Sequence, residues 1–479
     1  MKKYFFLFLG LSLFVLSCSN DDDGNVPVST VTQDFMWRAM NQWYFWQADV
    51  ADLADDRFST EAEYNSYLQS YTDPESFFLE TLLFEEDRFS FENENYEELV
   101  SSLSGISQSN GVEFGLGLIG DTGNVFGFVQ YIWPDSDAST KNISRGEFFT
   151  RVDGVQLTTG NYRELLFGDN STYTLGMATI TDNTISDSAK EVTLTKVQNQ
   201  VEDPILVAKT LDVNGTKVAY LMYNRFLSSF NEDLNDAFAT FKAEGATELV
   251  LDVRYNPGGS VNTSRLLASM IYGTNTSDVY IKQRWNNKIQ AQLSDDFLTD
   301  YFANSTGSSP INTLNLSRVF VIATESSASA SELVMNGLAP YIDVIHIGET
   351  TSGKNEFSIT LVDDPGNSFV YNSDREGNIN PQNSWGLQPL VGRNENADGF
   401  SDYTSGLVPD IAISEDLTNL GTLGEVSEPL LARALEEIAP GVTKIDFTVE
   451  MPADAFTTSR IHTPVRDHMY LEKPLQLTK

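Results

Sequence analysis

Two residues that could carry out nucleophilic catalysis, Ser329 and Lys354, lie 25 residues apart in the sequence. Ser329 belongs to a serine-rich turn between a predicted buried strand at 319–323 and a predicted helix at 330–339. A hydroxyl at a helix start lies at the positive end of the helix dipole, among backbone N–H groups that have no acceptor within the helix. That setting suits a nucleophile, although the same serines could also be simple turn and N-cap residues.

Lys354 is the candidate general base. It follows Gly353 in a loop just beyond a second predicted strand, at 344–347, and this setting permits burial. Burial disfavours the charged ammonium form and lowers the pKa of a lysine from about 10.4 toward neutrality. A neutral Lys354 amine could accept the proton of Ser329 as the serine attacks a carbonyl group.

The three histidines are the other possible bases. His346 lies in the predicted strand at 344–347, while His462 and His468 lie in the C-terminal tail, which we expect to be irregular. None of these positions places an imidazole beside Ser329, so we interpret all three as core or surface residues. The chemistry therefore favours a Ser-Lys pair over a Ser-His-Asp triad.

A tight turn could supply the amide donors that an oxyanion needs during acyl transfer. The turn at 256–259, Asn-Pro-Gly-Gly, follows a predicted strand at 248–253. Gly258 and Gly259 can offer one amide with little steric hindrance. The amide of Ala330, at the predicted helix start, can offer the other.

The rest of the chain divides into stretches that differ in the spacing of their apolar residues. Residues 32–103 are mostly helical by their three- and four-residue apolar spacing, with an aromatic stripe that we assign to the core. Short strands with glycine turns follow between 111 and 196. From 217 onward, predicted strands and helices alternate as they do in α/β proteins.

The stretch Phe114-Gly115-Leu116-Gly117-Leu118 is predicted to be an apolar glycine loop whose backbone amides could bind an anion. The order of strands, turns and a helix at 162–167 around it resembles a PDZ domain. Such a domain adds an extended peptide as a strand and captures its terminal carboxylate. The resemblance implies that Gly115, Leu116, Gly117 and Leu118 form the carboxylate loop.

The N-terminus resembles a bacterial lipoprotein signal. Two lysines precede an apolar run at 4–16, and the run closes at Cys18, the only cysteine of the chain. The resemblance implies cleavage before Cys18 and lipid attachment to its sulfur. The protein would then be anchored in the cell envelope, on the periplasmic or the surface-exposed side of the outer membrane, and would contact the membrane through the lipid alone.

Composition excludes some classes of partner. The 30 basic and 68 acidic residues give a net charge of −38, which argues against nucleic acid and anionic membrane surfaces as partners. Protein or peptide substrates remain open. A stretch at 394–399 superficially fits the start of a calcium loop, but its twelfth position is Ser405 rather than glutamate. We therefore expect a solvated loop there, and neither a metal nor another cofactor.

Three motifs together resemble the carboxy-terminal processing peptidases, which are tail-specific serine proteases with a Ser-Lys catalytic pair. Ser-Ala-Ser-Ala-Ser-Glu at 327–332 matches the nucleophile motif, with Ser329 as the middle serine. Gly-Glu-Thr-Thr-Ser-Gly-Lys at 348–354 matches the motif that ends in the base, Lys354. The stretch at 251–259 matches the turn that contributes an oxyanion-hole amide. Shorter matches to lipoprotein members lie at 87–90, 385–389 and 406–410.

The resemblance implies a mixed α+β fold with an N-terminal helical domain, a PDZ-like β-rich domain and an α/β core of the crotonase-like spiral type. It implies a serine endopeptidase that cleaves unstructured or C-terminal protein segments through an acyl-enzyme on Ser329. The predicted divisions are a signal peptide at 1–17, an acidic tether at 18–30, a helical domain at 31–104, a PDZ-like domain at 105–200, a protease core at 201–445 and a tail at 446–479.

A third catalytic residue cannot be assigned by the resemblance. Many members carry glycine directly after the lysine and glutamine four residues after it, where this chain has Asn355 and Ser358. Others carry aspartate 11 residues after the serine, where it has Pro340. Ser358 is a candidate hydrogen-bond partner of Lys354. Two alternatives stay open: a non-catalytic peptide-binding lipoprotein that keeps the protease scaffold, and acyl-CoA chemistry on a related scaffold.

Overall fold

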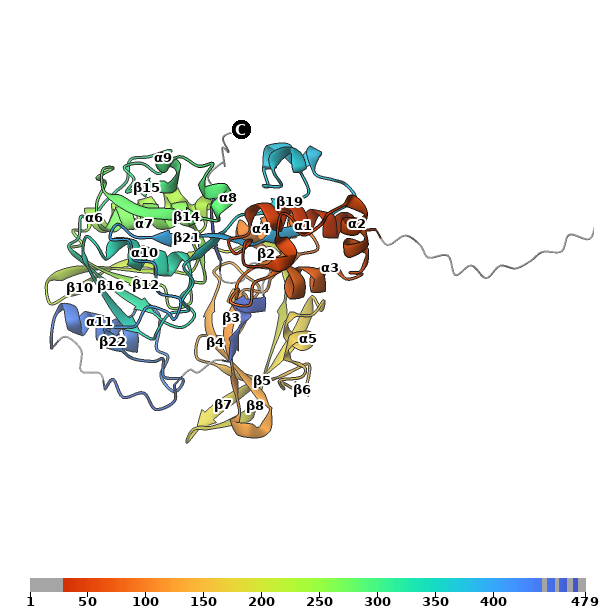
Figure 1. The fold of residues 1–479 in the computed structure, drawn as a ribbon. Helices are drawn as coiled ribbons and strands as arrows, with labels where there is room; N and C mark the ends of the chain where they lie inside the picture. Colours follow the sequence, from red (N-terminus) through yellow and green to blue (C-terminus); the bar gives the residue numbers. More distant parts are fainter. Residues whose placement is uncertain (1–28, 442–445, 453–455, 463–467, 473–479) are drawn as a thin grey trace, which may run out of the picture.

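The computed structural model describes residues 29–441, 446–452, 456–462 and 468–472. The predicted signal peptide, Cys18 and most of the predicted acidic tether lie outside these residues. The described part has a mixed α+β fold, as the motifs implied (Figure 1). Within it, no helix combines the length and the apolar character needed to cross a membrane.

A six-stranded sheet with the order β10-β11-β12-β16-β17-β22 forms the centre of the α/β part. Its strands run parallel from β11 to β22, and β10 is antiparallel to β11. Alternate residues of β11, β12 and β16 enter two separate cores, so both faces of the sheet are covered there, as parallel sheets require. The strands are β10 Ile205–Val213, β11 Thr216–Tyr223, β12 Glu248–Asp252, β16 Arg318–Ala323, β17 Asp343–Gly348 and β22 Ile411–Ala412.

Four helices accompany this sheet: α6 Asn231–Ala243, α7 Val261–Ile271, α10 Ala330–Leu338 and α11 Pro429–Ile438. Helix α10 begins at residue 330, as predicted. The N-cap of α11 is Glu428. Glu428 takes this place because its carboxylate accepts the N–H of Leu431 at 2.7 Å.

A second six-stranded sheet, with the order β13-β24-β18-β21-β14-β15, lies beside the serine-rich turn. The alternating run at 357–362 predicts one strand, but in the structure this strand is interrupted after residue 358. The C-terminal tail is not irregular as predicted, since it supplies β24, which lies between β13 and β18. The strands are β13 Gly258–Ser260, β24 His468–Tyr470, β18 Glu356–Ser358, β21 Leu390–Glu395, β14 Val279–Trp285 and β15 Thr299–Tyr301.

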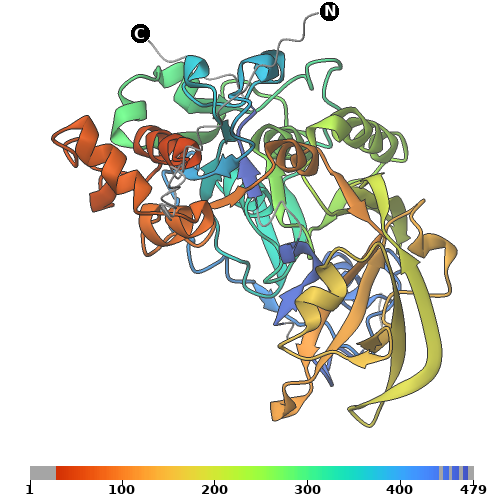
Figure 2. The ribbon, with the colours of Figure 1, turned by 90° about the vertical axis from the view of Figure 1, so that its right-hand side faces the viewer.

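The β-rich part has its own hydrophobic core and projects from the lower side of the molecule (Figures 1 and 2). Its sheet has the order β23-β3-β4-β5-β7-β8, and β23 comes from the C-terminal tail. The elements are β3 Val112–Leu118, β4 Val125–Ile132, β5 Phe148–Val152, α5 Tyr162–Phe167, β7 Thr172–Thr181, β8 Thr184–Thr195 and β23 Thr457–Thr458, with β6 Val155–Gln156 paired to β5, and β2 Ile106–Ser109 paired to β9 Val197–Val201.

The predicted glycine loop is not a loop but part of β3. A Cβ on Gly115 would lie 2.3 Å from the ring of Phe128, and one on Gly117 would lie 2.5 Å from the ring of Phe126. These glycines therefore make room for aromatic rings of the paired strand β4, and their backbones belong to a sheet rather than to an anion nest.

The N-terminal helices are α1 Val31–Trp43, α2 Glu61–Gln69, α3 Pro74–Ser76 and α4 Tyr96–Leu103. The predicted aromatic stripe of α1 is buried in the same cluster as side chains of β12 and β16. Thr60 caps α2, because its Oγ1 accepts the N–H of Glu63 at 3.2 Å. The chain then enters a small sheet of β1 Phe91–Asn93, β20 Gly386–Gln388 and β19 Leu361–Val362.

Candidate functional site

Ser329 lies at the turn between β16 and α10 in a backbone conformation that favours glycine. Its φ of 66° and ψ of −114° are rare for other residues, and such strain is concentrated at functional sites. The side chain is fully buried, and its Oγ has no hydrogen-bond partner in the described part of the chain. Because a buried hydroxyl without a partner is costly, Ser329 is not an ordinary N-cap residue.

The neighbouring buried serines are structural. Ser327 Oγ donates to the carbonyl oxygen of Val253 at 2.8 Å, and Ser331 Oγ donates to that of Asn256 at 3.0 Å. These bonds fasten the serine-rich turn to the end of β12 and to the turn that follows it. Among the buried serines of this fully described run, Ser329 alone keeps its hydroxyl uncommitted.

One carboxylate, that of Glu332, holds the serine turn and the lysine loop together. Its Oε2 accepts the backbone N–H of Ser329 at 2.7 Å and that of Lys354 at 2.9 Å. Its Oε1 accepts the N–H of Gly353 at 2.7 Å and the hydroxyl of Thr351 at 2.5 Å. Both predicted catalytic residues are therefore brought together at their backbones.

Sequence analysis gave Glu332 no role beyond its place in the motif. Ser-x-x-Glu before an apolar helix is a capping-box pattern, and this signal could have identified the bond from the carboxylate to the N–H of Ser329. The further bonds to the lysine loop could not be read from it, because they join two separate segments.

Glu332 is expected to make stability depend on pH. Burial raises the pKa of its carboxyl from 4.5 to about 7, although the donated hydrogen bonds favour the ionised form. Since the folded pKa lies above the unfolded one, the folded state binds the proton more tightly between these values. We expect this group to lower the free energy of unfolding as the pH rises through this window, by up to about 1.4 kcal/mol per pH unit.

Urea titrations at several pH values test this expectation. In Glu332→Gln the part of the slope that comes from this carboxyl should be absent, although the variant is less stable at neutral pH because an amide NH₂ then faces N–H donors. Glu425→Gln, which alters a mostly exposed carboxylate paired with Lys209, is the matched control. The same slope in Glu332→Gln and wild type contradicts the prediction.

Lys354 is fully buried, with its amine between an aromatic ring and a histidine. Nζ lies 4.8 Å from the centre of the Phe89 ring and 3.5 Å from Nδ1 of His468. Ser329 is buried as well, so a substrate carbonyl can reach its Oγ only after a covering element moves.

Residues 87–90 lie next to Lys354. Arg88 donates from Nη2 to the carbonyl oxygen of Gly353 at 2.7 Å, which fixes the residue before the lysine. Asp87 Oδ1 accepts the N–H groups of Phe89 and Ser90 at 2.9 and 2.8 Å, and so shapes this loop. The N-terminal segment therefore positions the lysine loop.

Gly258 packs against the side chain of Ser329. Its φ of 110° is in the left-handed region, and a Cβ there would lie 2.3 Å from the carbonyl oxygen of His468 and 2.6 Å from Cβ of Ser329. Only glycine therefore fits without a shift of the backbone. Its N–H donates to Oδ1 of Asn256 at 2.9 Å, so this predicted oxyanion donor is engaged in the present structure. The oxyanion roles of Gly258, Gly259 and Ala330 stay predictions.

A buried cluster of charged side chains surrounds Arg254, which lies just before the turn at 256–259. Arg254 is fully buried and contacts three carboxylates, at 2.7 Å for Asp252, 2.7 Å for Glu428 and 3.0 Å for Glu415. Arg145, from the β-rich part, contacts Glu415 at 2.6 Å. The cluster thus joins the β-rich part, the end of β12 and the N-cap of α11.

The tail brings His468, which is buried, to the lysine, and this contact was not predicted from the sequence. Strand β24 lies between β13 and β18, with the N–H of His468 donating to the carbonyl oxygen of Pro257 at 3.1 Å. Ser358, the candidate partner of Lys354, instead donates from Oγ to the carbonyl oxygen of Met469 at 3.1 Å. His346 is buried in β17 as expected.

The tail also pairs with β3, the strand that contains the residues of the predicted carboxylate loop. Strand β23 pairs antiparallel with Gly115 and Leu116, and the ring centroid of Phe456 lies 5.4 Å from that of Tyr162. His462 stacks on Phe167 at 4.2 Å. The chain's own tail therefore occupies this edge of β3, and a role of Gly115, Leu116, Gly117 and Leu118 in binding another peptide stays a prediction.

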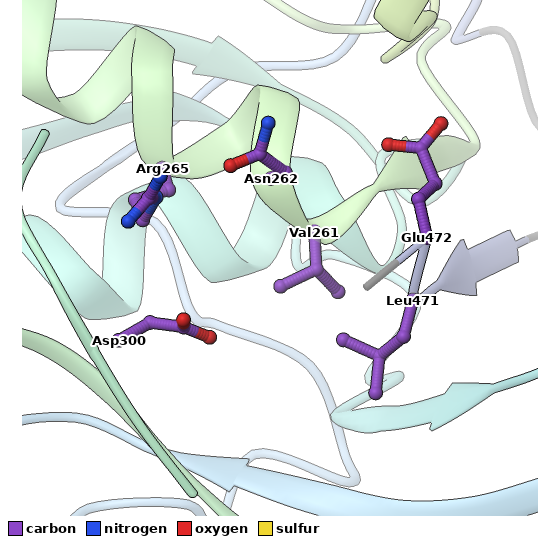
Figure 3. A pocket seen from close by; sticks show the side chains of 6 residues that line it. All are labelled: Val261, Asn262, Arg265, Asp300, Leu471 and Glu472. Atoms are coloured by element: carbon purple, nitrogen blue, oxygen red, sulfur yellow. The ribbon is translucent and has the colours of Figure 1, made fainter. Parts of the chain in front are cut away.

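A pocket beside the end of β24 is separate from Ser329 and Lys354 (Figure 3). At its rim, Ser260 Oγ donates to the carboxylate of Glu472 at 2.6 Å, and this bond anchors the residues after β24 to the start of α7. The pocket is lined by Val261, Asn262, Arg265, Asp300, Leu471 and Glu472. The described part holds no cluster of side chains suited to a metal ion.

Comparison with known proteins places this site in a family. Residues 217–385 match Peptidase family S41, and residues 32–91 match the Peptidase S41 N-terminal domain. A candidate S41 protease from Bacteroides fragilis has a solved structure with a TM-score of 0.66 and 26% identity, covering 85% of this chain and 97% of that one.

Two curated relatives match a smaller part of this chain than that structure does. The tail-specific protease of Haemophilus influenzae is 24% identical over 225 residues, which are 47% of this chain and 28% of the relative. The chloroplastic carboxyl-terminal-processing peptidase 3 of Arabidopsis thaliana is 25% identical over 249 residues, 49% of this chain and 44% of the relative. The chain thus spans less than half the length of these relatives, while both of the family's domains match it. Its two matched domains are those of peptidase family S41.

Proposed function

We propose that the chain is a serine endopeptidase of the carboxy-terminal processing type, with Ser329 as nucleophile and Lys354 as general base. The Glu332 carboxylate carries this proposal, because it holds the backbones of both residues at one point. A scaffold that only binds peptides has no physical need for an uncommitted buried hydroxyl held next to a buried lysine loop.

In the proposed reaction, Nζ of Lys354 accepts the Oγ proton while Oγ bonds to the carbonyl carbon of the scissile peptide. Backbone N–H groups stabilise the oxyanion; the candidates are those of Gly258, once it releases Asn256, Gly259 and Ala330. The Lys354 ammonium then donates its proton to the leaving nitrogen, the C–N bond breaks, and an ester remains on the serine. Water attacks the ester carbon while Lys354 accepts a proton from it, and Lys354 then returns this proton to Oγ as the acyl C–O bond breaks, which releases the acid and restores the hydroxyl.

The proposed substrates are unstructured or C-terminal protein segments. A segment that adds to the edge of β3 has to displace β23, because the tail already pairs with Gly115 and Leu116. The proposed location is the cell envelope, with a lipid on Cys18 as the anchor.

A serine-reactive fluorophosphonate separates this function from the alternative, a peptide-binding protein without activity. In a soluble form that begins after Cys18, we expect stoichiometric labelling that mass spectrometry maps to Ser329. Ser329→Ala should not react, whereas Ser326→Ala, a change of the half-buried serine in the same turn, should react like wild type. Failure of the folded wild-type protein to react at Ser329 argues for the binding-only alternative.

A further inference from the structure

We propose that His468 is the positioning residue of Lys354: its Nδ1 accepts a hydrogen bond from Nζ and fixes the direction of the amine. This inference rests on the proposed function. The two nitrogens are 3.5 Å apart, at the outer limit of a hydrogen bond, and catalytic hydrogen bonds are often long before substrate binds. An accepting Nδ1 requires a neutral imidazole with its proton on Nε2.

The position of the imidazole is fixed by the sheet. Strand β24 is an inner strand, paired with β13 through Gly258 and with β18 through Ser358. The next residue, Met469, is fully buried in the main hydrophobic core. Tyr470 donates from its hydroxyl to the carbonyl oxygen of Leu103 at 3.1 Å. The backbone of His468 therefore has no freedom to move away from the site without breaking this sheet.

The ring itself is held by a stack. Its centroid lies 4.4 Å from that of Phe91, at an interplanar angle of 20°, and His468 is only 2% exposed. A ring that is stacked on one face and buried cannot turn freely about its Cα–Cβ bond. Its Nδ1 is thus a pre-organised acceptor, which is what an orienting residue must be.

A hydrogen bond to Nδ1 would fix the direction of the lysine amine. A neutral amine has one lone pair, and rotation about the Cε–Nζ bond can turn it away from Ser329. When one N–H is committed to Nδ1, this rotation is restricted and the lone pair has a defined direction. The hydroxyl of Ser358, the partner expected from the sequence, donates to the carbonyl oxygen of Met469.

The opposing explanation is that His468 only packs in the core. Two substitutions separate the two roles, because each keeps one property of the imidazole. His468→Phe keeps the ring and its stack on Phe91 but removes the acceptor. His468→Asn removes the ring but keeps an oxygen acceptor close to the position of Nδ1. A structural role predicts that the Phe variant performs better, and a positioning role predicts the reverse.

The measurements are the melting temperature and the maximal rate of Ser329 labelling by a fluorophosphonate, from a series of probe concentrations. We expect His468→Phe to melt within a few degrees of wild type and to react about 10- to 100-fold more slowly, with an unchanged half-saturating concentration. His468→Asn should melt at a lower temperature and still react faster than His468→Phe. If the Asn variant is unfolded at the assay temperature, all variants are compared at a lower temperature at which it is folded.

Two results would overturn the inference: labelling of His468→Phe at the wild-type rate, or labelling rates that follow the order of the melting temperatures. His346→Phe, a change of a buried histidine in β17, controls for the loss of an interior imidazole and should react like wild type. If the wild-type protein itself does not react at Ser329, the proposed function fails, which is a different outcome from failure of this inference alone.

Discussion

Replacement of Lys354 by methionine should lower the turnover of an unfolded protein by about 10³-fold, in line with the loss of a general base. Methionine keeps an unbranched chain of similar volume in the buried site, and the backbone N–H that binds Glu332 is unchanged. Because no amine has to be kept out of water, the melting temperature should equal or exceed that of wild type. Ser329→Ala should lose at least as much activity.

This prediction is specific because Lys354→Met should lose turnover while its melting temperature is kept. The assay is cleavage of a reduced, alkylated protein by the purified soluble form, with a melting curve for each variant. Lys209→Met removes a partly exposed amine that pairs with Glu425, and it should change neither quantity much. Turnover by Lys354→Met at the wild-type rate excludes Lys354 as the base and makes His468, whose Nδ1 lies 3.5 Å from Nζ, the next candidate to test.

Local sequence signals predicted the elements that carry Ser329 and Lys354. Branched apolar runs gave β16 and β17, and the serine-rich turn gave the start of α10, all within a single stretch of about 40 residues. The pattern is informative here because a parallel strand that is buried on both faces reads as a continuous apolar run. The motif match then assigned chemistry to two residues that the fold brings together through one carboxylate.

Contacts between distant segments could not be predicted in this way. His468 is 114 residues from Lys354, and β24 has three residues, too short for a period to show. Its position depends on pairing with β13 and β18, which no local propensity encodes. The prediction of a glycine loop in β3 failed for a related reason. These glycines make room for aromatic rings of β4, and this cross-strand contact has the same local sequence pattern as a turn.

Arg254→Met should destabilise the fold by about 3–5 kcal/mol, because it leaves buried carboxylates without their main cation. Asp252 keeps the hydroxyl of Tyr220, and Glu415 keeps Arg145, but Glu428 loses both of its contacts to the guanidinium. The N-cap of α11 is therefore the weakest point of the variant. Urea titration at pH 7 measures the loss, and Arg433→Met, which breaks a more exposed i,i+4 pair with Glu437 on the same helix, should cost under about 1 kcal/mol.

The pH dependence of this loss identifies its cause. Burial acts to raise the pKa of Glu415, but the guanidinium groups of Arg145 and Arg254 outweigh that effect and hold it below 4.5. A lowered folded pKa contributes stability above the unfolded pKa, and this contribution disappears as the pH falls through the folded pKa. The difference between wild type and Arg254→Met should therefore be largest at neutral pH and shrink below about pH 4.5, as the pH approaches the lowered pKa of Glu415. A difference that stays constant with pH would mean that Arg254 acts through packing volume rather than charge.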